Sequence, residues 1–425
     1  MGSYRRGLRG KNYNPVLFLM LFASVLLLPL LFSCGGGGGS SGSSSTAPDN
    51  TMSIYSNNDP TYGAILNVPY VTIYINGKPF NLLLDTGATG IMVNSQALAD
   101  AGVNLPQTNN YFSGYFGDNT SFSGYVTNAD TVSTLPSGGL TATNIPIAVA
   151  TTDTAFPSNG LIQGDFGMGL SPFVTFGNFN GANQTFSITP SLVQGLSAAA
   201  YSNGFILNFN SNLLNNDGYA YINSNQSIGS IIFGLNTEPN NNVSSGYTFF
   251  RSDPVWANAP CPVIDTAFGL TTADSYGFPF YSYFDTGANF ILLGSDALSD
   301  SISNFTASEE YNCDGATNIV MGGLPVAFHL SNPSSNSYSD LSFITSPDDK
   351  NLNYEFCPSN IPNNNSLLVS NFVIDMGNSV QNNPEAMGLP FMLNRSMYWQ
   401  APTLIYADPP PNRWNISTWG VGIKQ

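Results

Sequence analysis

Two acidic residues in nearly identical surroundings carry the strongest chemical signal in this sequence. Asp85 ends the leucine run at residues 82–84 and is followed at once by Thr86, Gly87 and Ala88. A short apolar run is typical of a buried strand, and a glycine after it is typical of a turn. Burying an ionised carboxylate is costly, so an acid at this position needs hydrogen-bond donors around it or a chemical role.

The same design recurs around Asp285, which is followed by Thr286, Gly287 and Ala288. The displacement from residue 85 to residue 285 is 200 positions, and the register holds beyond the motif. Four further pairs match in type: Ile91 with Ile291, Ser95 with Ser295, Ala97 with Ala297 and Leu98 with Leu298. One copy alone would be an ordinary turn. Two copies predict related halves that each offer one carboxylate to a shared site.

Paired carboxylates can perform acid–base chemistry without further help. Two acids close together cannot both ionise easily, so the pair shares a proton. The ionised member can take a proton from a water molecule while the other donates one. We therefore expect no metal and no cofactor. The single histidine, His329, lies in an alternating segment and is interpreted as a strand residue, which leaves no Ser-His-Asp or Cys-His site.

The elements that must position the acids read as β-strands. Residues 70–75 are rich in β-branched and aromatic types, and Asn76-Gly77 after them is a strong hairpin signal. No segment shows a long 3.6-residue periodicity, so only short helices are expected, one of them after each acid motif. We predict an all-β protein with a few short helices. Polarity peaks near residue 240, which predicts lobes over 60–240 and 241–425.

The N-terminus has the composition of an export signal. Basic residues at positions 5–11 precede an apolar run at 16–32, which is the order found in secretory signals. The run ends just before Cys34, and a Gly/Ser-rich stretch follows, so we predict a signal over 1–34 and a flexible tether over 35–59. The alternative is an uncleaved membrane anchor, because the run lies at the lower edge of spanning length.

The segment before Cys34 resembles the lipobox of bacterial lipoproteins, although Phe32 is a less usual residue there. That resemblance implies lipidation of Cys34 and a body anchored in the bacterial cell envelope, on its periplasmic or surface face. The net charge of −16 argues against nucleic-acid binding, which uses basic patches.

Further landmarks, in order along the chain, resemble the pepsin-like bilobal aspartic proteases. They are the two Asp-Thr-Gly motifs, the apolar segments at residues 166–170 and 386–391, and those at 190–207 and 229–234. The resemblance covers about residues 60–425. It implies two β-lobes with a cleft between them, catalytic Asp85 and Asp285, and a monomer that hydrolyses polypeptides. It also implies that Gly167 and Gly388 thread behind the acid loops.

Several residues depart from that family. Pepsins usually carry Ser or Thr after the motif, and this chain has Ala88 and Ala288, as retroviral-type aspartic proteases have alanine. The flap falls at residues 111–125 without a clearly aligned tyrosine, so Tyr115 and Phe116 are the candidates. A further Asp-Thr at 265–266 lacks the glycine and is interpreted as unrelated to the site.

The same resemblance implies a disulfide between Cys313 and Cys357, which leaves Cys261 free. Two other functions stay open at this stage. A surface lipoprotein could keep the cleft as a binding module without turnover. A carbohydrate-binding β-protein would suit the many aromatic residues but leaves the paired motifs unexplained.

Overall fold

The computed structural model of this 425-residue chain describes residues 49–57, 68–115, 121–153, 156, 160–170, 175–176, 186–187, 190–210, 219–220, 226–252, 261–270, 280–288, 291–293, 318–319, 325–332, 337–344, 368–369, 372–374, 385–393, 395–402, 404–405, 415–416 and 419–424. Residues Pro48–Gln425 form one compact unit. The predicted signal and Cys34 lie outside the described residues. Within them, no helix has the length and apolar character needed to cross a bilayer.

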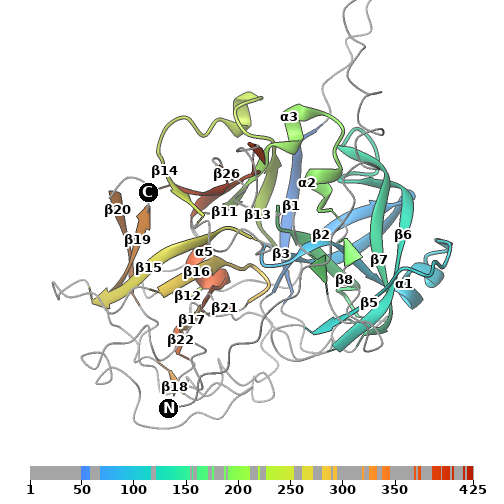
Figure 1. The fold of residues 1–425 in the computed structure, drawn as a ribbon, viewed down its shortest axis with the longest axis horizontal. Coiled ribbons are helices and arrows are strands. Elements are labelled where there is room, and N and C mark those ends of the chain that lie inside the picture. Colours follow the sequence, from blue (N-terminus) through green and yellow to red (C-terminus); the bar gives the residue numbers. More distant parts are fainter. Residues whose placement is uncertain are drawn as a thin grey trace, which may run out of the picture. The chain divides into compact units, whose positions relative to one another are not determined.

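Strands dominate the described residues, and the largest sheet they form is one of thirteen strands (Figure 1). Its thirteen strands pair in the order β14 (Tyr247–Arg251), β27 (Gly420–Lys424), β24 (Ser396–Gln400), β11 (Gly204–Phe209), β13 (Ser227–Phe233), β1 (Thr51–Asn57), β2 (Val68–Ile75), β3 (Lys78–Asp85), β8 (Gly164–Met168), β4 (Thr89–Asn94), β7 (Thr141–Asp153), β6 (Ser121–Ser133) and β5 (Tyr111–Tyr115).

Part of this sheet closes on itself, because β2 pairs with β6 as well as with β3. The ring β2-β3-β8-β4-β7-β6, blue to green in Figure 1, surrounds apolar side chains that are removed from water. Leu82, Leu84 and Ile91 from the first acid motif are among them. The apolar residues that flank Asp85 therefore anchor its loop to the main core.

A second sheet of eight strands carries the other acid motif. Its order is β18 (Asn318–Ile319), β22 (Phe372–Ile374), β17 (Ile291–Leu293), β23 (Glu385–Met387), β16 (Phe280–Phe284), β15 (Val263–Leu270), β19 (Pro325–Asn332) and β20 (Ser337–Ile344). Three two-stranded pairs complete the strands: β9 (Thr175–Phe176) with β10 (Phe186–Ser187), β12 (Tyr219–Ala220) with β21 (Leu368–Val369), and β25 (Leu404–Ile405) with β26 (Asn415–Ile416). His329 lies in β19, as predicted for a strand residue.

Within the described residues, the helices are few and short. They are α1 (Ser95–Asp100), α2 (Leu192–Gly195), α3 (Ala199–Ser202), α5 (Leu389–Met392) and the 3₁₀ turn η2 (Pro239–Asn241). The prediction of an all-β protein with a few short helices is therefore confirmed.

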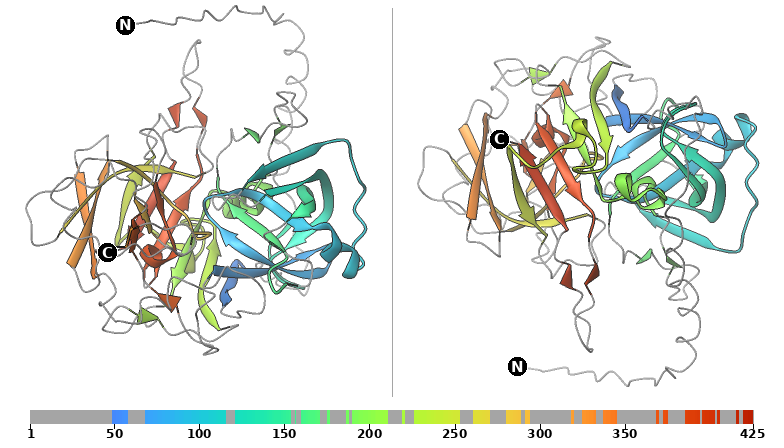
Figure 2. Two further views of the ribbon diagram at one scale, coloured as in Figure 1. Left: turned by 90° about the horizontal axis from the view of Figure 1, so that it is seen from below. Right: turned by 90° about the horizontal axis from the view of Figure 1, so that it is seen from above.

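Strands from both sides of the predicted lobe boundary share the long sheet. β24 and β27, red in both views of Figure 2, come from the end of the chain, and β24 pairs with β11 from the first half. The rings of Phe205 and Trp399 stack across this pairing, with centroids 5.1 Å apart. The boundary near residue 240 thus separates the two acid motifs but does not separate two sheets, and it stays a prediction.

Local sequence signals explain how the first acid strand is held. Asn76 and Gly77 both adopt positive φ, 48° and 78°, as a two-residue hairpin turn between β2 and β3 requires. The Asn94 side chain accepts bonds from the backbone N–H groups of Gln96 and Ala97 and so caps α1. Both features follow from short-range chemistry, and both fall where the sequence predicted a turn and a helix.

One predicted boundary is wrong. The flexible tether was expected to run to residue 59, but residues Thr51–Asn57 form β1, between β13 and β2. Met52, Ile54 and Ser56 are buried, and Ser53 between them is exposed. This alternation places one side of β1 against the core. The alternation is hard to recognise in the sequence, because the inward residue Ser56 is polar and only Met52 and Ile54 are apolar.

Candidate active site

The two acid motifs occupy matching places in the two sheets. Asp85 is the last residue of β3, and Asp285 directly follows the last residue of β16. In each case a parallel strand runs alongside, β8 beside β3 and β23 beside β16. The strand after the motif then pairs antiparallel with that same neighbour. The repeat inferred from the sequence is therefore a repeat of topology. The helix expected after the second motif falls outside the described residues.

Two threonines join the motifs directly. The backbone N–H of Thr86 donates to Oγ1 of Thr286, and the N–H of Thr286 donates to Oγ1 of Thr86, both at 3.0 Å. Each hydroxyl also donates across the junction. Oγ1 of Thr86 bonds the carbonyl of Phe284 at 2.7 Å, and Oγ1 of Thr286 bonds that of Leu84 at 2.5 Å. These four bonds fix the separation and orientation of the two acid loops.

The glycines after the acids leave room for the opposite carboxyl group. A Cβ added to Gly87 would lie 2.7 Å from Cγ of Asp285, and a Cβ added to Gly287 would lie 2.9 Å from Cγ of Asp85. Real side chains do not approach so closely. The absence of side chains at these positions therefore lets the carboxyl groups converge, and Asp85 and Asp285 are hydrogen-bonded to each other.

Backbone donors hold each carboxyl group in place. Oδ1 of Asp85 accepts from the N–H groups of Gly87 and Ala88, at 2.6 and 2.9 Å. Oδ1 of Asp285 accepts from the N–H of Gly287 at 2.8 Å. The alanines at 88 and 288 contribute no side-chain donor. Their carbonyls accept bonds from the N–H groups of Gly169 and Leu389 and so tie the loops to the segments behind them.

Burial changes the acidity of both groups. It raises the pKa of Asp85 well above its ordinary value, and the negative charges of Asp285 and Asp165 raise that pKa further. Burial also raises the pKa of Asp285, although its hydrogen bonds with Asp85 and with backbone N–H groups offset part of that effect. Such a pair retains one proton to a higher pH than an isolated aspartate does.

The two glycines expected behind the loops lie at corresponding positions. Gly167 is the register partner of Asp85 in β8, and a Cβ there would lie 2.6 Å from the carbonyl oxygen of Gly90. Gly388 directly follows β23 and precedes α5. The N–H of Asp285 donates to the carbonyl of Met387, next to Gly388, at 3.1 Å. Both segments therefore lie directly beside an acid loop.

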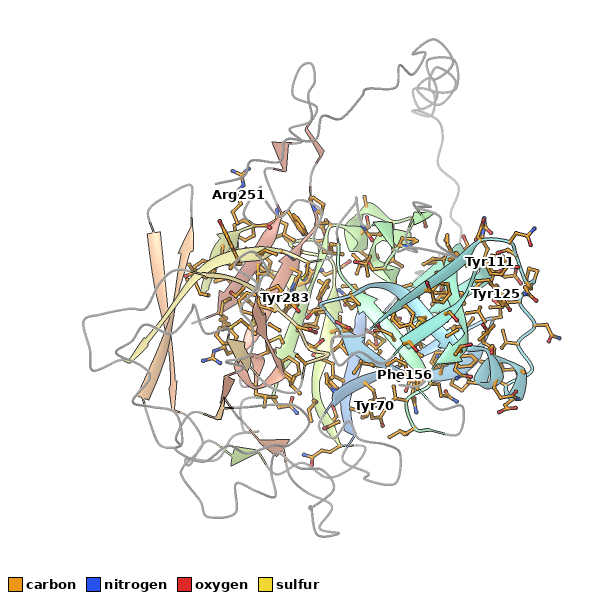
Figure 3. All side chains as sticks on the ribbon, turned by 60° about the horizontal axis from the view of Figure 1, so that its bottom comes forward. Tyr70, Tyr111, Tyr125, Phe156, Arg251 and Tyr283 are labelled. Atoms are coloured by element: carbon orange, nitrogen blue, oxygen red, sulfur yellow. The ribbon has the colours of Figure 1, made fainter. Side chains whose placement is uncertain are left out.

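The predicted flap falls on a hairpin. β5 and β6 pair antiparallel, with Tyr111 opposite Tyr125 and Tyr115 opposite Ser121. Tyr111 and Tyr125 are labelled side by side in Figure 3. Phe116 lies outside the described residues, so the role of Tyr115 and Phe116 stays a prediction. Phe112 and Phe122 from this hairpin pack together, with ring centroids 6.0 Å apart.

These two phenylalanines belong to an apolar cluster on the face of the sheet that carries Asp85. The cluster consists of Tyr70, Leu83, Met92, Phe112, Phe122, Ala150, Phe156 and Ile162, and it is called the Asp85-face cluster below. Leu83 and Asp85 are two residues apart in β3, so their side chains leave the strand on the same side. Tyr70 and Phe156 are labelled next to each other in Figure 3.

Two residues near the acids were missed by sequence reasoning. Asp165 is buried in β8, and its charge acts on Asp85. Cys261 is buried and free, and the β15–β16 register extended by two residues brings it opposite Asp285. Burial raises the pKa of Cys261 well above its ordinary value, and the charges of Asp285 and Asp85 add to this effect. Asp165 could have been identified as an acid inside a strand that is buried throughout. Cys261 could be placed near the acids only from the strand register.

The remaining predicted residues divide into those placed and those outside the described part. Asp265 and Thr266 lie in the interior of β15 rather than at a strand end, as expected for a motif unrelated to the site. Cys313 and Cys357 lie outside the described residues, and their disulfide stays a prediction. Within the described part of the chain, no group of three or more His, Cys, Asp or Glu residues is arranged to hold a metal ion.

Comparisons with known proteins agree with this geometry. Residues 71–170 match the family model described as aspartyl protease. Among solved structures, the crystal structure of aspartic proteinase from Irpex lacteus is similar over 88% of this chain and 97% of that chain, with a TM-score of 0.56 and 16% sequence identity. The chain therefore has the fold of the pepsin-like aspartic proteinases. A search of curated proteins found no match.

Proposed function

We propose that this protein is an aspartic endopeptidase, in which Asp85 and Asp285 activate one water molecule for attack on a peptide bond. The observation that carries the proposal is the convergence of two mutually hydrogen-bonded carboxyl groups from two related loops. The family match over residues 71–170 includes the first of these loops. A pair that shares one proton supplies an acid and a base at the same point.

The chemistry follows from that shared proton. The ionised carboxylate takes a proton from the water, whose oxygen attacks the carbonyl carbon of the peptide bond. The protonated carboxyl donates its proton to the carbonyl oxygen, which gives a neutral tetrahedral intermediate. When the carbon–nitrogen bond breaks, the protonated carboxyl gives its proton to the leaving nitrogen, and the ionised one takes a proton from a hydroxyl of the intermediate, so the pair again shares one proton. The threonine bonds keep both acids within reach of one water, so little reorganisation is needed in the transition state.

Cleavage of a mixed peptide library by the full-length protein, over a range of pH, tests this proposal. We expect defined internal cleavages that are suppressed by a pepstatin-type inhibitor, whose hydroxyl mimics the tetrahedral intermediate. Both acids come from one chain, and we propose that a monomer is sufficient. The rate of peptide cleavage should therefore be proportional to protein concentration, as expected for an active monomer. A folded protein that cleaves nothing at any pH would contradict the proposal.

The rival function is binding without turnover. It is favoured by Ala88 and Ala288, because a hydroxyl at either position could support the neighbouring acid and none is present. A binding module would retain peptides in an equilibrium assay and return them intact. The same library therefore distinguishes the two functions by the mass of the recovered peptides.

We also propose that the protein is an exported lipoprotein of the bacterial cell envelope, anchored through Cys34. The support is the order of basic residues, apolar run, cysteine and Gly/Ser-rich stretch at the N-terminus. A Cys34→Ser variant should then leave the membrane fraction or keep its signal uncleaved. Unchanged processing and unchanged membrane association would favour an uncleaved anchor.

A further inference from the structure

A third buried aspartate stands close to the acid pair. Asp165 lies in β8, where it is the register partner of Leu83 in β3 and of Met92 in β4. The next residue of β8 on the same face is Gly167, which is the partner of Asp85 and of Gly90. Alternate residues of a strand point to the same side. Asp165 and Asp85 therefore share one face of the sheet as diagonal neighbours on adjacent strands.

The strand geometry gives their spacing. Adjacent strands lie about 4.8 Å apart and each residue advances about 3.3 Å, so the Cα atoms of diagonal neighbours are about 8 Å apart. No side chain stands at Gly167 or Gly90 to separate the two carboxyl groups. At this spacing in a protein interior, a negative charge on one acid raises the pKa of the other.

The surroundings of Asp165 favour a strong electrostatic effect. Its side chain is 5% exposed and shares its face with the Asp85-face cluster, which is apolar apart from the hydroxyl of Tyr70. Burial raises the pKa of Tyr70 to about 12, so that hydroxyl is neutral at working pH. The described lysines and arginines are Lys78, Arg251, Arg395 and Lys424. None of them is a strand partner of Asp165 or of Asp85.

Other titratable groups lie beyond Asp85. Asp285 is bonded to it, and the buried Cys261 thiol is close enough to feel the charge of both acids. Asp165 stands in the sheet that carries Asp85, where it pairs with Leu83. The corresponding position in the sheet that carries Asp285 is Ala386, which pairs with Tyr283. The described acids on that side occupy other register positions, Glu385 opposite Ser282 and Asp265 opposite Tyr281. Asp165 therefore acts unequally on two carboxyl groups that otherwise occupy matching loops.

We propose that Asp165 is a positioning residue that holds the shared proton on Asp85, so that Asp85 is the acid and Asp285 the base of the pair. Two observations agree with this assignment. Asp85 is 8% exposed, whereas Asp285 is half-buried, so ionisation costs more at Asp85. Asp165 stands on the face of the sheet that carries Asp85, and its negative charge raises the pKa of Asp85 further.

The inference rests on the proposed function for its catalytic meaning, but its test does not require turnover. Carbon-13 NMR of the full-length protein in detergent, with labelled aspartate carboxyl groups, follows each titration. Asp85→Asn, Asp285→Asn and Asp165→Asn assign the signals. In the wild-type protein, Asp85 should titrate at a higher pH than Asp285, and Asp165 should ionise at a lower pH than Asp85. The reverse order for either pair would overturn the inference.

The Asp165→Asn variant then measures the effect of the charge. It retains the shape of the side chain and should lower the titration midpoint of Asp85 by about one pH unit. Asp165→Glu, which retains the charge, should move the midpoint much less. Asp130→Asn removes an exposed charge from β6 and serves as the matched control, with no change expected. If the titration midpoint of Asp85 moves no more in Asp165→Asn than in Asp130→Asn, the proposal is contradicted. If Asp165→Asn does not fold, the order in which the three acids titrate in the wild-type protein still decides the question.

Peptide cleavage gives an independent readout. If the protein is a peptidase, the alkaline limb of the kcat/KM profile should move to lower pH in Asp165→Asn, by the same amount as the Asp85 titration. A purely structural role would lower activity at every pH and leave that midpoint unchanged. A protein that cleaves no peptide but shows the expected titrations would refute the proposed function and leave the role of Asp165 standing.

Discussion

Thr86 and Thr286 exchange hydrogen bonds across the junction between the two acid loops, with each backbone N–H donating to the other residue's hydroxyl at 3.0 Å. Both side chains are fully buried. A small movement of one loop would break several buried bonds together, so the arrangement resists changes in the distance between the acids. The position of the carboxyl pair is therefore set by residues that take no part in the chemistry.

Replacing Thr86 by Val should expose the importance of this junction. The variant keeps the side-chain shape but leaves the carbonyl of Phe284 and the N–H of Thr286 without their bonds. Each buried group that loses its partner costs about 1–3 kcal/mol. We expect a loss of about 2–4 kcal/mol in the free energy of unfolding, measured in urea, together with a large fall in kcat. Thr86→Ser retains the hydroxyl and should keep most of the free energy of unfolding and most of kcat. An equal loss in Thr86→Val and Thr86→Ser would refute this explanation.

Gly87→Ala should impair catalysis more than stability. The added methyl group would lie 2.7 Å from Cγ of Asp285 and must push that carboxyl group away. A displacement of about 1 Å in a catalytic group can lower the rate about 100-fold. Gly77→Ala is the matched control. A methyl group added at residue 77 would meet no atom within 4 Å, but the φ of +78° there would strain an alanine. It should lower the melting temperature and leave kcat unchanged. Similar kcat values for the two variants would show that Gly87 does not shape the site.

Asp85→Asn should stabilise the protein at neutral pH. Burial raises the pKa of Asp85 in the folded state, so above the ordinary value of 3.8 the unfolded chain ionises more readily than the folded one. Stability therefore falls as the pH rises from that value through the folded pKa, by about 1.4 kcal/mol for each pH unit that separates the two pKa values. Asparagine removes this penalty. Thermal unfolding should show a higher Tm for Asp85→Asn near pH 7 and equal values near pH 3. A constant difference between the two proteins at all pH values would contradict a raised pKa for Asp85.

Peptide mapping under non-reducing conditions tests the cysteines. We expect Cys313 joined to Cys357, a link that should stabilise the fold by about 3–4 kcal/mol, and Cys261 recovered as a thiol. Because Cys261 is buried and its pKa is raised, it should react with alkylating reagents only after unfolding. Recovery of Cys261 in a disulfide with either partner would overturn the assignment.

The sequence could predict those features whose causes are local. The turn at Asn76-Gly77, the short helix after the first acid motif and the repeated Asp-Thr-Gly loops each depend on a few adjacent residues, and the structure has them where they were expected. The pairing of the two motifs could be inferred because the chain repeats the pattern at constant spacing. Repetition therefore carried long-range information that a single motif lacks.

Features that depend on strand register could not be predicted in this way. The strand β7 spans thirteen residues and was not identified, because its alternation is interrupted by Asn144 and Pro146. β1 was placed in the tether because its core contacts come from β13 and β2, neither of which adjoins it in the sequence. Asp165 and Cys261 approach the acids only once the order of the strands is known.

Peptide cleavage by the wild type, Asp85→Asn, Asp285→Asn and the double variant tests the central claim most directly. The two acids share one proton and act on one water, so either single substitution should abolish turnover, and the double variant should be scarcely slower than either single one. Circular dichroism should show the same fold in all four proteins, because asparagine retains the volume of aspartate. Undetectable cleavage in both single variants, beside an active wild type, is the result that the paired-acid mechanism predicts. Substantial cleavage by either folded single variant would contradict it.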